Sequence, residues 1–365
     1  MLYPDYENGL VNLISSILKH YGVEPYHSTL PTLDIILKKD YKNIVLMLFD
    51  GMGTDILNHH LQRKSYLRKH FQLSLSSVFP PTTTAAVTTL SSGLTPAEHG
   101  WLGWSLYFSE VDKVVNAFIN TEKGSGKPAA SYHVGEKVLA YQSVYEQINE
   151  TGNATAYNVS KFGTNVISKY EELFQEIERL CSQGGKKYIY SYWEEPDTLM
   201  HDNGCYAPVV TEYIKKIDKS IEALCNILSD TLIIVTADHG HTSTEYFCIS
   251  DYPMLERMLY LPVSVESRAA AFYVKEEFKN VFKNTFYETF GEAFLLLSQE
   301  EIIEQKIFGN GIIHPKFSEL TGDFLAIAIS NKGIVQNHYS SQLRSNHAGM
   351  TEKEMLIPFI ICSSK

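Results

Sequence analysis

Three aspartates and two histidines lie where apolar stretches of the sequence end in turns, and a third histidine lies in a late loop. These residues are Asp50, Asp197, His201, Asp238, His239 and His347. Carboxylate and imidazole are the ligands that zinc-type divalent ions use, and six of them suffice for two ions that keep open positions for a substrate. Asp197 and His201 are four residues apart, so a helical turn after Pro196 would place them on one face. Each pair is weak evidence by itself, and the prediction of a metal site rests on the whole set.

A threonine cluster supplies a second kind of chemistry. Residues 82–84 are all threonine, follow two prolines and precede a run of small residues that is typical of a helix start. A hydroxyl at such a position lies beside unpaired N–H donors and the positive end of the helix dipole, which favours phosphate. Threonine at a helix start is more often a simple cap, so the cluster alone does not distinguish a cap from a nucleophile.

Short apolar runs must position these side chains. Residues 43–49 lead into Asp50, residues 187–193 lead into the segment that holds Asp197, and residues 231–235 lead into Asp238. Uninterrupted apolar runs are typical of strands that are buried on both faces of a parallel sheet. Open α/β sheets bind ligands beyond the carboxyl ends of such strands, so we expect the three strand ends to form one site.

The order of strands and amphipathic helices predicts an α/β fold, with a three-layer αβα sandwich around a mostly parallel sheet. Between residues 245 and 337 the pattern changes, because charged helical pieces alternate with short apolar strands. We predict a core formed by residues 1–244 and 338–365, and a cap-like α+β insertion formed by residues 245–337. Residues 101–134 show little periodicity and are expected to cross the sheet edge as a long excursion.

Composition restricts the partners. The net charge of −11 disfavours a general binder of nucleic-acid polymers, whereas a small phosphorylated substrate stays compatible with it because bound cations supply positive charge locally. No run is long and apolar enough to span a membrane, and the N-terminus lacks the pattern of a signal peptide. The five scattered cysteines have no metal or redox spacing, which predicts reduced thiols in a cytoplasmic protein. The oligomeric state is not predicted.

The ordered motifs resemble the alkaline phosphatase superfamily, specifically its nucleotide pyrophosphatase/phosphodiesterase (type I phosphodiesterase) branch. The matching segments are Leu48-Phe49-Asp50-Gly51, Phe79-Pro80 with Thr83, Gly93-Leu94-Thr95-Pro96 with His99-Gly100, Glu194-Glu195-Pro196-Asp197 with His201, Ala237-Asp238-His239-Gly240, and His347. They run in family order from residue 43 to the C-terminus, apart from the insertions.

The resemblance implies a division of the ligands between two divalent metal ions, zinc by preference with manganese as the alternative. One ion would be held by Asp50, Asp238 and His239, and the other by the set Asp197, His201 and His347. Thr83 would be both a ligand and the nucleophile, and its attack on phosphorus would give a phosphothreonine that water then hydrolyses.

Two departures from the family pattern bear on the substrate. Ala86 stands where many members have an asparagine, and the surroundings of His347 differ from those of the animal enzymes. No substrate-binding residue is predicted. Two divalent ions and three aspartates leave about one positive charge, which suits a monoanionic diester. We therefore predict cleavage of phosphodiester or pyrophosphate bonds in small, nucleotide-like substrates.

The alternative on the same scaffold is a phosphomonoesterase or a phosphonate hydrolase. A dianionic substrate would need a further cation, for which Lys161 or Arg344 are the candidates. A sulfatase is disfavoured because the sequence has no Cys-x-Pro-x-Arg-type segment, and a non-catalytic relative is disfavoured because all six ligands are present. Two other histidines are interpreted differently: His99 as a turn residue that bonds the backbone, and His241 as a surface residue or a support for a ligand.

Overall fold

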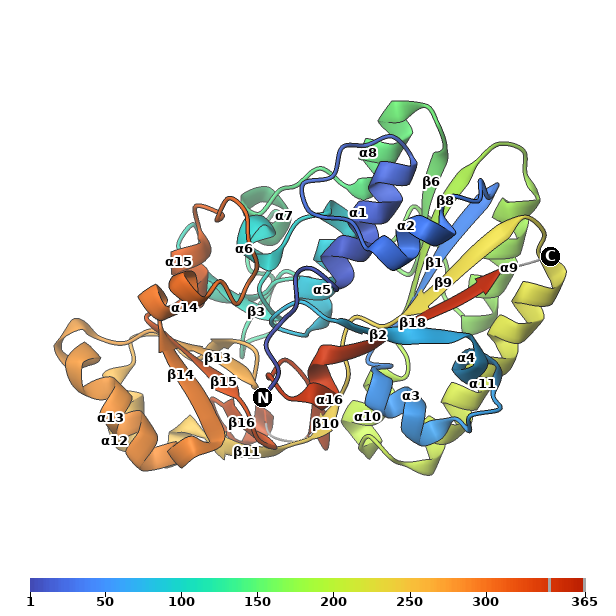
Figure 1. Ribbon diagram of the computed structural model, residues 1–365. Helices are drawn as coiled ribbons and strands as arrows, with labels where there is room; N and C mark the ends of the chain where they lie inside the picture. The colour runs from blue at the N-terminus through green and yellow to red at the C-terminus, as the bar shows by residue number, and fades with distance from the viewer. Residues whose placement is uncertain (341–342, 364–365) are drawn as a thin grey trace.

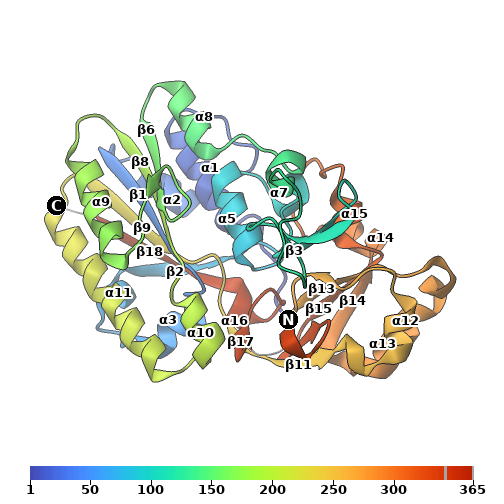
Figure 2. The ribbon, with the colours of Figure 1, turned by 180° about the vertical axis from the view of Figure 1, so that it is seen from behind.

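The computed structural model describes residues 1–340 and 343–363, and its core is a seven-stranded sheet with helices on both faces (Figures 1 and 2). The strand order is β2-β18-β9-β1-β8-β6-β7, in which β18 is antiparallel to both β2 and β9 and all other pairs are parallel. The bounds are β1 (Asn43–Phe49), β2 (Phe71–Ser76), β6 (Thr155–Ser160), β7 (Asn165–Val166), β8 (Lys187–Trp193), β9 (Thr231–Thr236) and β18 (Leu356–Ser363). The expected αβα sandwich around a mostly parallel sheet is confirmed.

The three central strands are buried along nearly their whole length, as their apolar runs predict. Every residue of β1 and of β9 is buried, because helices cover both faces of the sheet. Strand β1 lies between β8 and β9 with Asn43 level with Lys187 and Thr231. The carboxyl ends of the three strands therefore lie side by side.

Helices form the two outer layers. One layer holds helices that contact one another, namely α1 (Leu10–His20), α5 (Thr83–Ser92) and α8 (Val144–Thr151), with α2 (Pro31–Ile36) against α1. The other layer holds α3 (Thr54–His60), α4 (Tyr66–His70), α9 (Tyr170–Ser182), α10 (Asp197–Asn203) and α11 (Pro208–Ile227). In the part of the chain that the structure describes, no helix is both long and apolar enough to cross a membrane.

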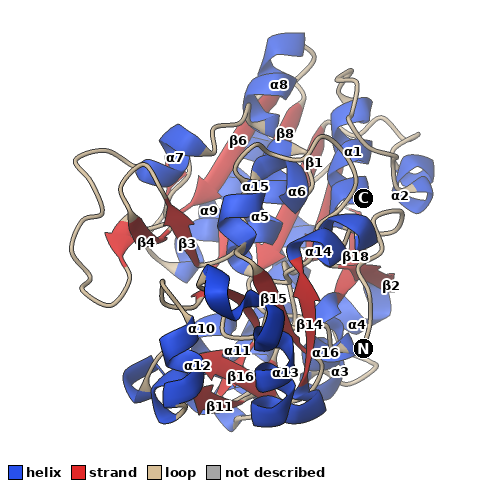
Figure 3. Ribbon diagram, turned by 90° about the vertical axis from the view of Figure 1, so that its left-hand side faces the viewer, coloured by secondary structure: helices blue, strands red, loops and turns tan. Residues whose placement is uncertain are grey.

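A second seven-stranded sheet lies beside the core (Figures 1 and 3). Its order is β14-β15-β13-β12-β3-β4-β5, with every pair antiparallel. The bounds are β3 (Ser105–Phe108), β4 (Lys113–Asn116), β5 (Thr121–Glu122), β12 (Ser264–Val265), β13 (Ala269–Phe272), β14 (Phe294–Ser298) and β15 (Phe324–Ala328). Helices α12 (Pro253–Met258), α13 (Lys279–Phe290), α14 (Gln299–Gln305) and α15 (Phe317–Thr321) accompany it.

The expectation that residues 101–134 form a long, irregular excursion over the sheet edge is thus wrong. This segment contributes three strands to the second sheet, because Val265 pairs with Ser105 and β3 continues the sheet to β4 and β5. The division at residues 245 and 337 stays a prediction, and of its last segment residues 341–342 and 364–365 lie outside the described residues.

Short elements complete the connections around the site. They are α6 (Pro96–His99), α7 (Val134–Val138), α16 (Glu352–Met355), the paired strands β10 (Thr242–Ser243) and β17 (Ser345–Asn346), the paired strands β11 (Glu245–Cys248) and β16 (Lys332–Val335), and the 3₁₀ turns at Ile249–Asp251, Glu276–Phe278, Gly291–Ala293 and His338–Ser340.

Candidate active site

The first group of candidate metal ligands forms where β1 and β9 end. The ligand atoms of Asp50, Asp238 and His239 all lie within 4.8 Å of one another. His239 Nε2 is 3.2 Å from Asp50 Oδ1 and 3.5 Å from Asp238 Oδ2. The three side chains are buried, so the structure brings together the residues for which the family resemblance implies a shared ion.

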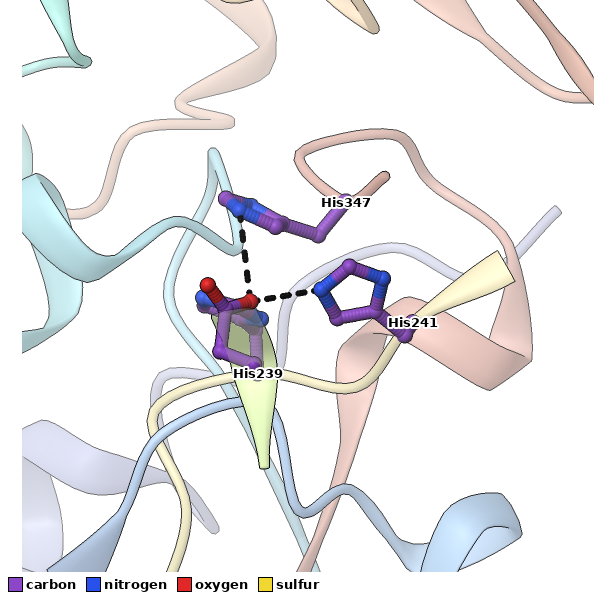
Figure 4. Close-up of side chains that lie close together, drawn as sticks. His239, His241 and His347 are labelled. Atoms are coloured by element: carbon purple, nitrogen blue, oxygen red, sulfur yellow. Dashed lines mark hydrogen bonds and ion pairs between the residues drawn. The ribbon is translucent and has the colours of Figure 1, made fainter. Parts of the chain in front are cut away.

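The second group forms where β8 leads into α10. His201 Nε2 is 3.3 Å from Asp197 Oδ2, and His347 Nε2 is 3.8 Å from Asp197 Oδ1. The imidazole of His347 stacks on that of His239 with ring centroids 3.7 Å apart, which places the two groups next to each other (Figure 4).

The three predicted histidine ligands share one hydrogen-bond pattern. Each has its Nδ1 against a backbone carbonyl: Ser345 O for His201 at 2.8 Å, Gly240 O for His239 at 3.0 Å, and Pro81 O for His347 at 3.2 Å. A proton on Nδ1 donates to the carbonyl and leaves the lone pair of Nε2 facing the carboxylates. This is the arrangement that a metal-binding histidine requires.

His241 departs from this pattern and corrects an expectation. Its side chain is 0 % exposed, and Nε2 lies 2.5 Å from Asp197 Oδ1, whereas Nδ1 is buried without a hydrogen-bond partner among the described residues. The interpretation as a surface residue is therefore wrong, whereas the contact with Asp197 agrees with the other interpretation, a support for a ligand. A Cβ on Gly240 would lie 1.9 Å from the carbonyl oxygen of Lys353, so only glycine fits this turn. His99, by contrast, accepts the Trp101 N–H at 3.0 Å, as expected of a turn histidine.

Thr83 is the first residue of α5 and faces the first group. Its Oγ1 donates toward Asp50 Oδ2 at 3.1 Å and lies 3.3 Å from His239 Nε2. Thr82 precedes it as the N-cap residue in an extended conformation, and the Thr84 hydroxyl is fully buried without a hydrogen-bond partner in the described chain. Of the three threonines, Thr83 is thus the one whose hydroxyl contacts the predicted ligands.

The buried carboxylates of the site lie close together, and a bound cation would stabilise their charged forms. Burial and the Asp197 carboxylate raise the pKa of Asp50 well above its ordinary value, and burial and Asp50 raise that of Asp238. For His201, burial opposes the charged form, but Asp197 outweighs it and the pKa rises to about 9. Asp238 Oδ2 is buried without a hydrogen-bond donor among the described residues. A divalent ion would relieve this crowding and satisfy that oxygen, so the residues present fit bound metal.

Sequence reasoning missed two other contacts. Tyr192, on β8, donates its hydroxyl to Asp50 Oδ2 at 2.5 Å. Glu266, in the connection after β12, accepts the Thr82 hydroxyl at 2.7 Å. The tyrosine-rich composition of β8 was the available signal for the first contact, and no local signal exists for the second because 184 residues separate its partners.

Lys161 and Arg344, the two cations considered as partners of a dianionic substrate, make contacts away from Thr83. Lys161 forms an ion pair with Glu194. Arg344 donates its backbone N–H to His201 O at 2.8 Å and has an exposed side chain. Neither contact brings a guanidinium or ammonium group onto Thr83.

The comparisons with known proteins agree with this site. A family model described as type I phosphodiesterase / nucleotide pyrophosphatase matches residues 44–288. The chain belongs to this family. Its members are phosphoester hydrolases, and this chain is assigned as a hydrolase on that basis. No curated protein sequence matches the chain.

Solved structures share the fold at low identity. An inactive variant of murine ectonucleotide pyrophosphatase/phosphodiesterase 5 in complex with AMP is 19 % identical, with a TM-score of 0.65 over 88 % of this chain and 87 % of that one. The human protein of the same name is also 19 % identical, with a TM-score of 0.64 over 88 % and 87 %. Phosphonoacetate hydrolase from Sinorhizobium meliloti 1021 in complex with phosphonoacetate is 14 % identical, with a TM-score of 0.62 over 89 % and 91 %.

Proposed function

We propose that the protein is a two-metal phosphodiesterase that cleaves phosphodiester or pyrophosphate bonds of small substrates through a phosphothreonine at Thr83. The observation that carries this proposal is the position of Thr83 Oγ1, within 3.1 Å of Asp50 Oδ2 and 3.3 Å of His239 Nε2. Asp50, Asp238 and His239 would hold one ion, and Asp197, His201 and His347 the other, with zinc preferred by this mixture of imidazole and carboxylate.

In the proposed reaction, Thr83 and Asp50 have separate roles. When bound, the ions supply positive charge that favours an ionised hydroxyl at neutral pH and stabilises negative charge on a phosphoryl group. Thr83 Oγ1, oriented by the start of α5, forms the bond to phosphorus while the ester bond to the leaving alcohol breaks. The Thr83 proton leaves along its hydrogen bond to Asp50 Oδ2. Water then cleaves the phosphothreonine, which returns the hydroxyl and releases the phosphomonoester.

His241 would act through Asp197. Its Nε2 contacts Asp197 Oδ1, while His201 lies on Oδ2, so both oxygens of this carboxylate are fixed in direction. Tyr192 orients Asp50 through a hydrogen bond to one of its oxygens, Oδ2.

We also propose a cytoplasmic location, which is supported by five cysteines that are all free and buried.

The purified protein is expected to bind two divalent ions per chain. Six ligands, five from the ends of β1, β8 and β9 and His347 from the turn after β17, would supply two sites, and in the proposed division Asp197 contributes to only one of them. Asp197→Asn should therefore lower the content by about one ion. Elemental analysis after reconstitution with zinc measures both values. One ion per fully active wild-type chain would contradict the assignment of two sites.

Diesters should be hydrolysed with higher kcat/KM than monoesters that have the same leaving group. Two divalent ions and three aspartates leave about one positive charge, and Lys161 is paired with Glu194. Missing stabilisation of a second negative charge costs on the order of 10²-fold in rate. Bis-p-nitrophenyl phosphate and p-nitrophenyl phosphate, compared at one pH and metal content, give the ratio. A preference for the monoester would assign the chain to the phosphatases of the same superfamily.

A further inference from the structure

A second set of metal-ligating side chains lies away from the core sheet, where β11 and β16 end (Figure 3). The two strands are parallel and pair over their whole length, so their carboxyl ends lie at one edge. A 3₁₀ turn follows each strand, and the Ser250 N–H of the first turn donates to Gln336 O at 3.2 Å. This pairing brings together Cys248, the last residue of β11, Asp251 in the first turn and His338 in the second.

The three side chains lie at distances that suit one ion. Each offers a ligand atom within 4.8 Å of those of the other two. His338 is central, with Nδ1 3.3 Å from Cys248 Sγ and Nε2 2.9 Å from Asp251 Oδ1. Ligands bound tetrahedrally at about 2.0–2.3 Å lie about 3.3–3.8 Å apart. The sulfur and Nδ1 already have this separation, and rotation of the Asp251 side chain would bring its carboxylate to the same ion.

Burial differs among the three residues in a way that suits binding from solvent. Cys248 is 3 % exposed, whereas the side chains of His338 and Asp251 are 69 % and 49 % exposed. The fold thus fixes the sulfur, and the other two side chains can turn toward an arriving ion. Among the described residues, the one ion pair of Asp251 is with His338, so no lysine or arginine there competes for its carboxylate.

The ligand types select the class of ion. Thiolate, imidazole and carboxylate together are typical of zinc-type ions, whereas magnesium and calcium prefer oxygen alone. The thiolate and the carboxylate balance the charge of one divalent ion. In the part of the chain that the structure describes, no other cysteine belongs to such a group. Burial raises the pKa of two of them, Cys181 and Cys205, to about 11.

We propose that Cys248, Asp251 and His338 bind a third divalent ion of the zinc type, with its fourth position open to water. The site is separate from the proposed phosphodiesterase activity. Ordering two exposed side chains lowers its affinity relative to the mostly buried active site, so the ion binds while metal is present in solution and is lost when unbound metal is removed. The content of two ions expected after reconstitution refers to the active site.

The third ion would join two segments that lead to the active site. Strand β10 begins directly after His241 and is followed by β11, and β17, which follows the turn after β16, ends directly before His347. Strands β10 and β17 also pair with each other. Metal bound at Cys248 would therefore fix these two segments relative to each other. The sequence gives no local signal for the site, because 90 residues separate Cys248 from His338.

Titration of the reduced protein with cobalt(II), with a phosphine reductant present, tests this site. A thiolate bound to cobalt gives a charge-transfer band in the near ultraviolet, and the six active-site ligands include no sulfur. The wild type should gain this band, and Cys248→Ser should lack it. His338→Gln should raise the cobalt concentration at half-saturation of the band by about tenfold or more, because a ligand is lost.

Cys181→Ser is the matched control, since it removes another buried thiol and should keep the band. Asp197→Asn, which alters the active site, should keep it too. No band in the wild type at saturating cobalt, an unchanged band in Cys248→Ser, or an unchanged half-saturation in His338→Gln would overturn the third site and leave the proposed function intact. A wild type that shows the band but hydrolyses no diester would overturn the proposed function and leave this site intact.

Discussion

Replacement of Thr83 by alanine is expected to lower kcat by roughly 10⁴-fold or more, because the attacking oxygen is lost. Neighbouring hydroxyls cannot substitute for it. Thr82 donates to Glu266, and the Thr84 hydroxyl is fully buried. Thr83→Ser should retain a measurable rate, since it keeps the oxygen at the start of α5. The measurement is kcat on bis-p-nitrophenyl phosphate at saturating metal, together with the melting temperature of each variant.

Thr84→Ala is the control for this experiment. It removes a hydroxyl from the same helix turn without touching Asp50 or His239, so its kcat should stay within a few-fold of the wild type. If Thr84→Ala or Thr82→Ala abolished turnover and Thr83→Ala did not, the nucleophile would be a different threonine.

The largest effect on stability is expected at a buried ion pair that joins the two sheets. Arg268, before β13, and Glu354, in α16, are both 0 % exposed and form a bidentate contact of 2.6 and 2.7 Å. Glu354 also accepts the Gly349 N–H at 2.8 Å, two residues after His347. Removing one partner leaves a buried charge without compensation, so Glu354→Gln should lower the free energy of unfolding by about 3–5 kcal/mol.

Chemical denaturation measures this loss. Glu352→Gln, an exposed position on the same helix, is the matched control and should change stability by less than about 0.5 kcal/mol. Arg268→Met combined with Glu354→Leu should recover most of the loss, because both charges are then absent. A Glu354→Gln protein within about 1 kcal/mol of the wild type would show that the pair does not stabilise the junction.

Much of the core was predictable because its signals are local. The apolar runs of β1, β8 and β9 identify strands that are buried on both faces, and each ends next to a ligand. Parallel strands bring their carboxyl ends to one edge, so five of the six ligands could be placed at one site before the fold was known. The inclusion of His347 and the division between two ions were implied by the family resemblance.

The remaining features depend on tertiary contacts. His241 follows a glycine turn that resembles any surface turn in sequence, and its burial against Asp197 depends on residues distant in the chain. Strands β4 and β5 have four and two residues, too few to show a period of two. The contact of Glu266 with Thr82 needs both sheets to be assembled, so no sequence pattern could reveal it.

The stereochemical course at phosphorus tests the central claim, attack by Thr83, most directly. A chiral p-nitrophenyl phosphorothioate diester is hydrolysed by the metal-loaded protein in ¹⁸O-labelled water, and the configuration of the product is determined. Attack by Thr83 followed by attack of water makes two in-line displacements, each with inversion, so the account predicts overall retention. Overall inversion would mean that water attacks phosphorus directly, and would contradict the phosphothreonine at Thr83.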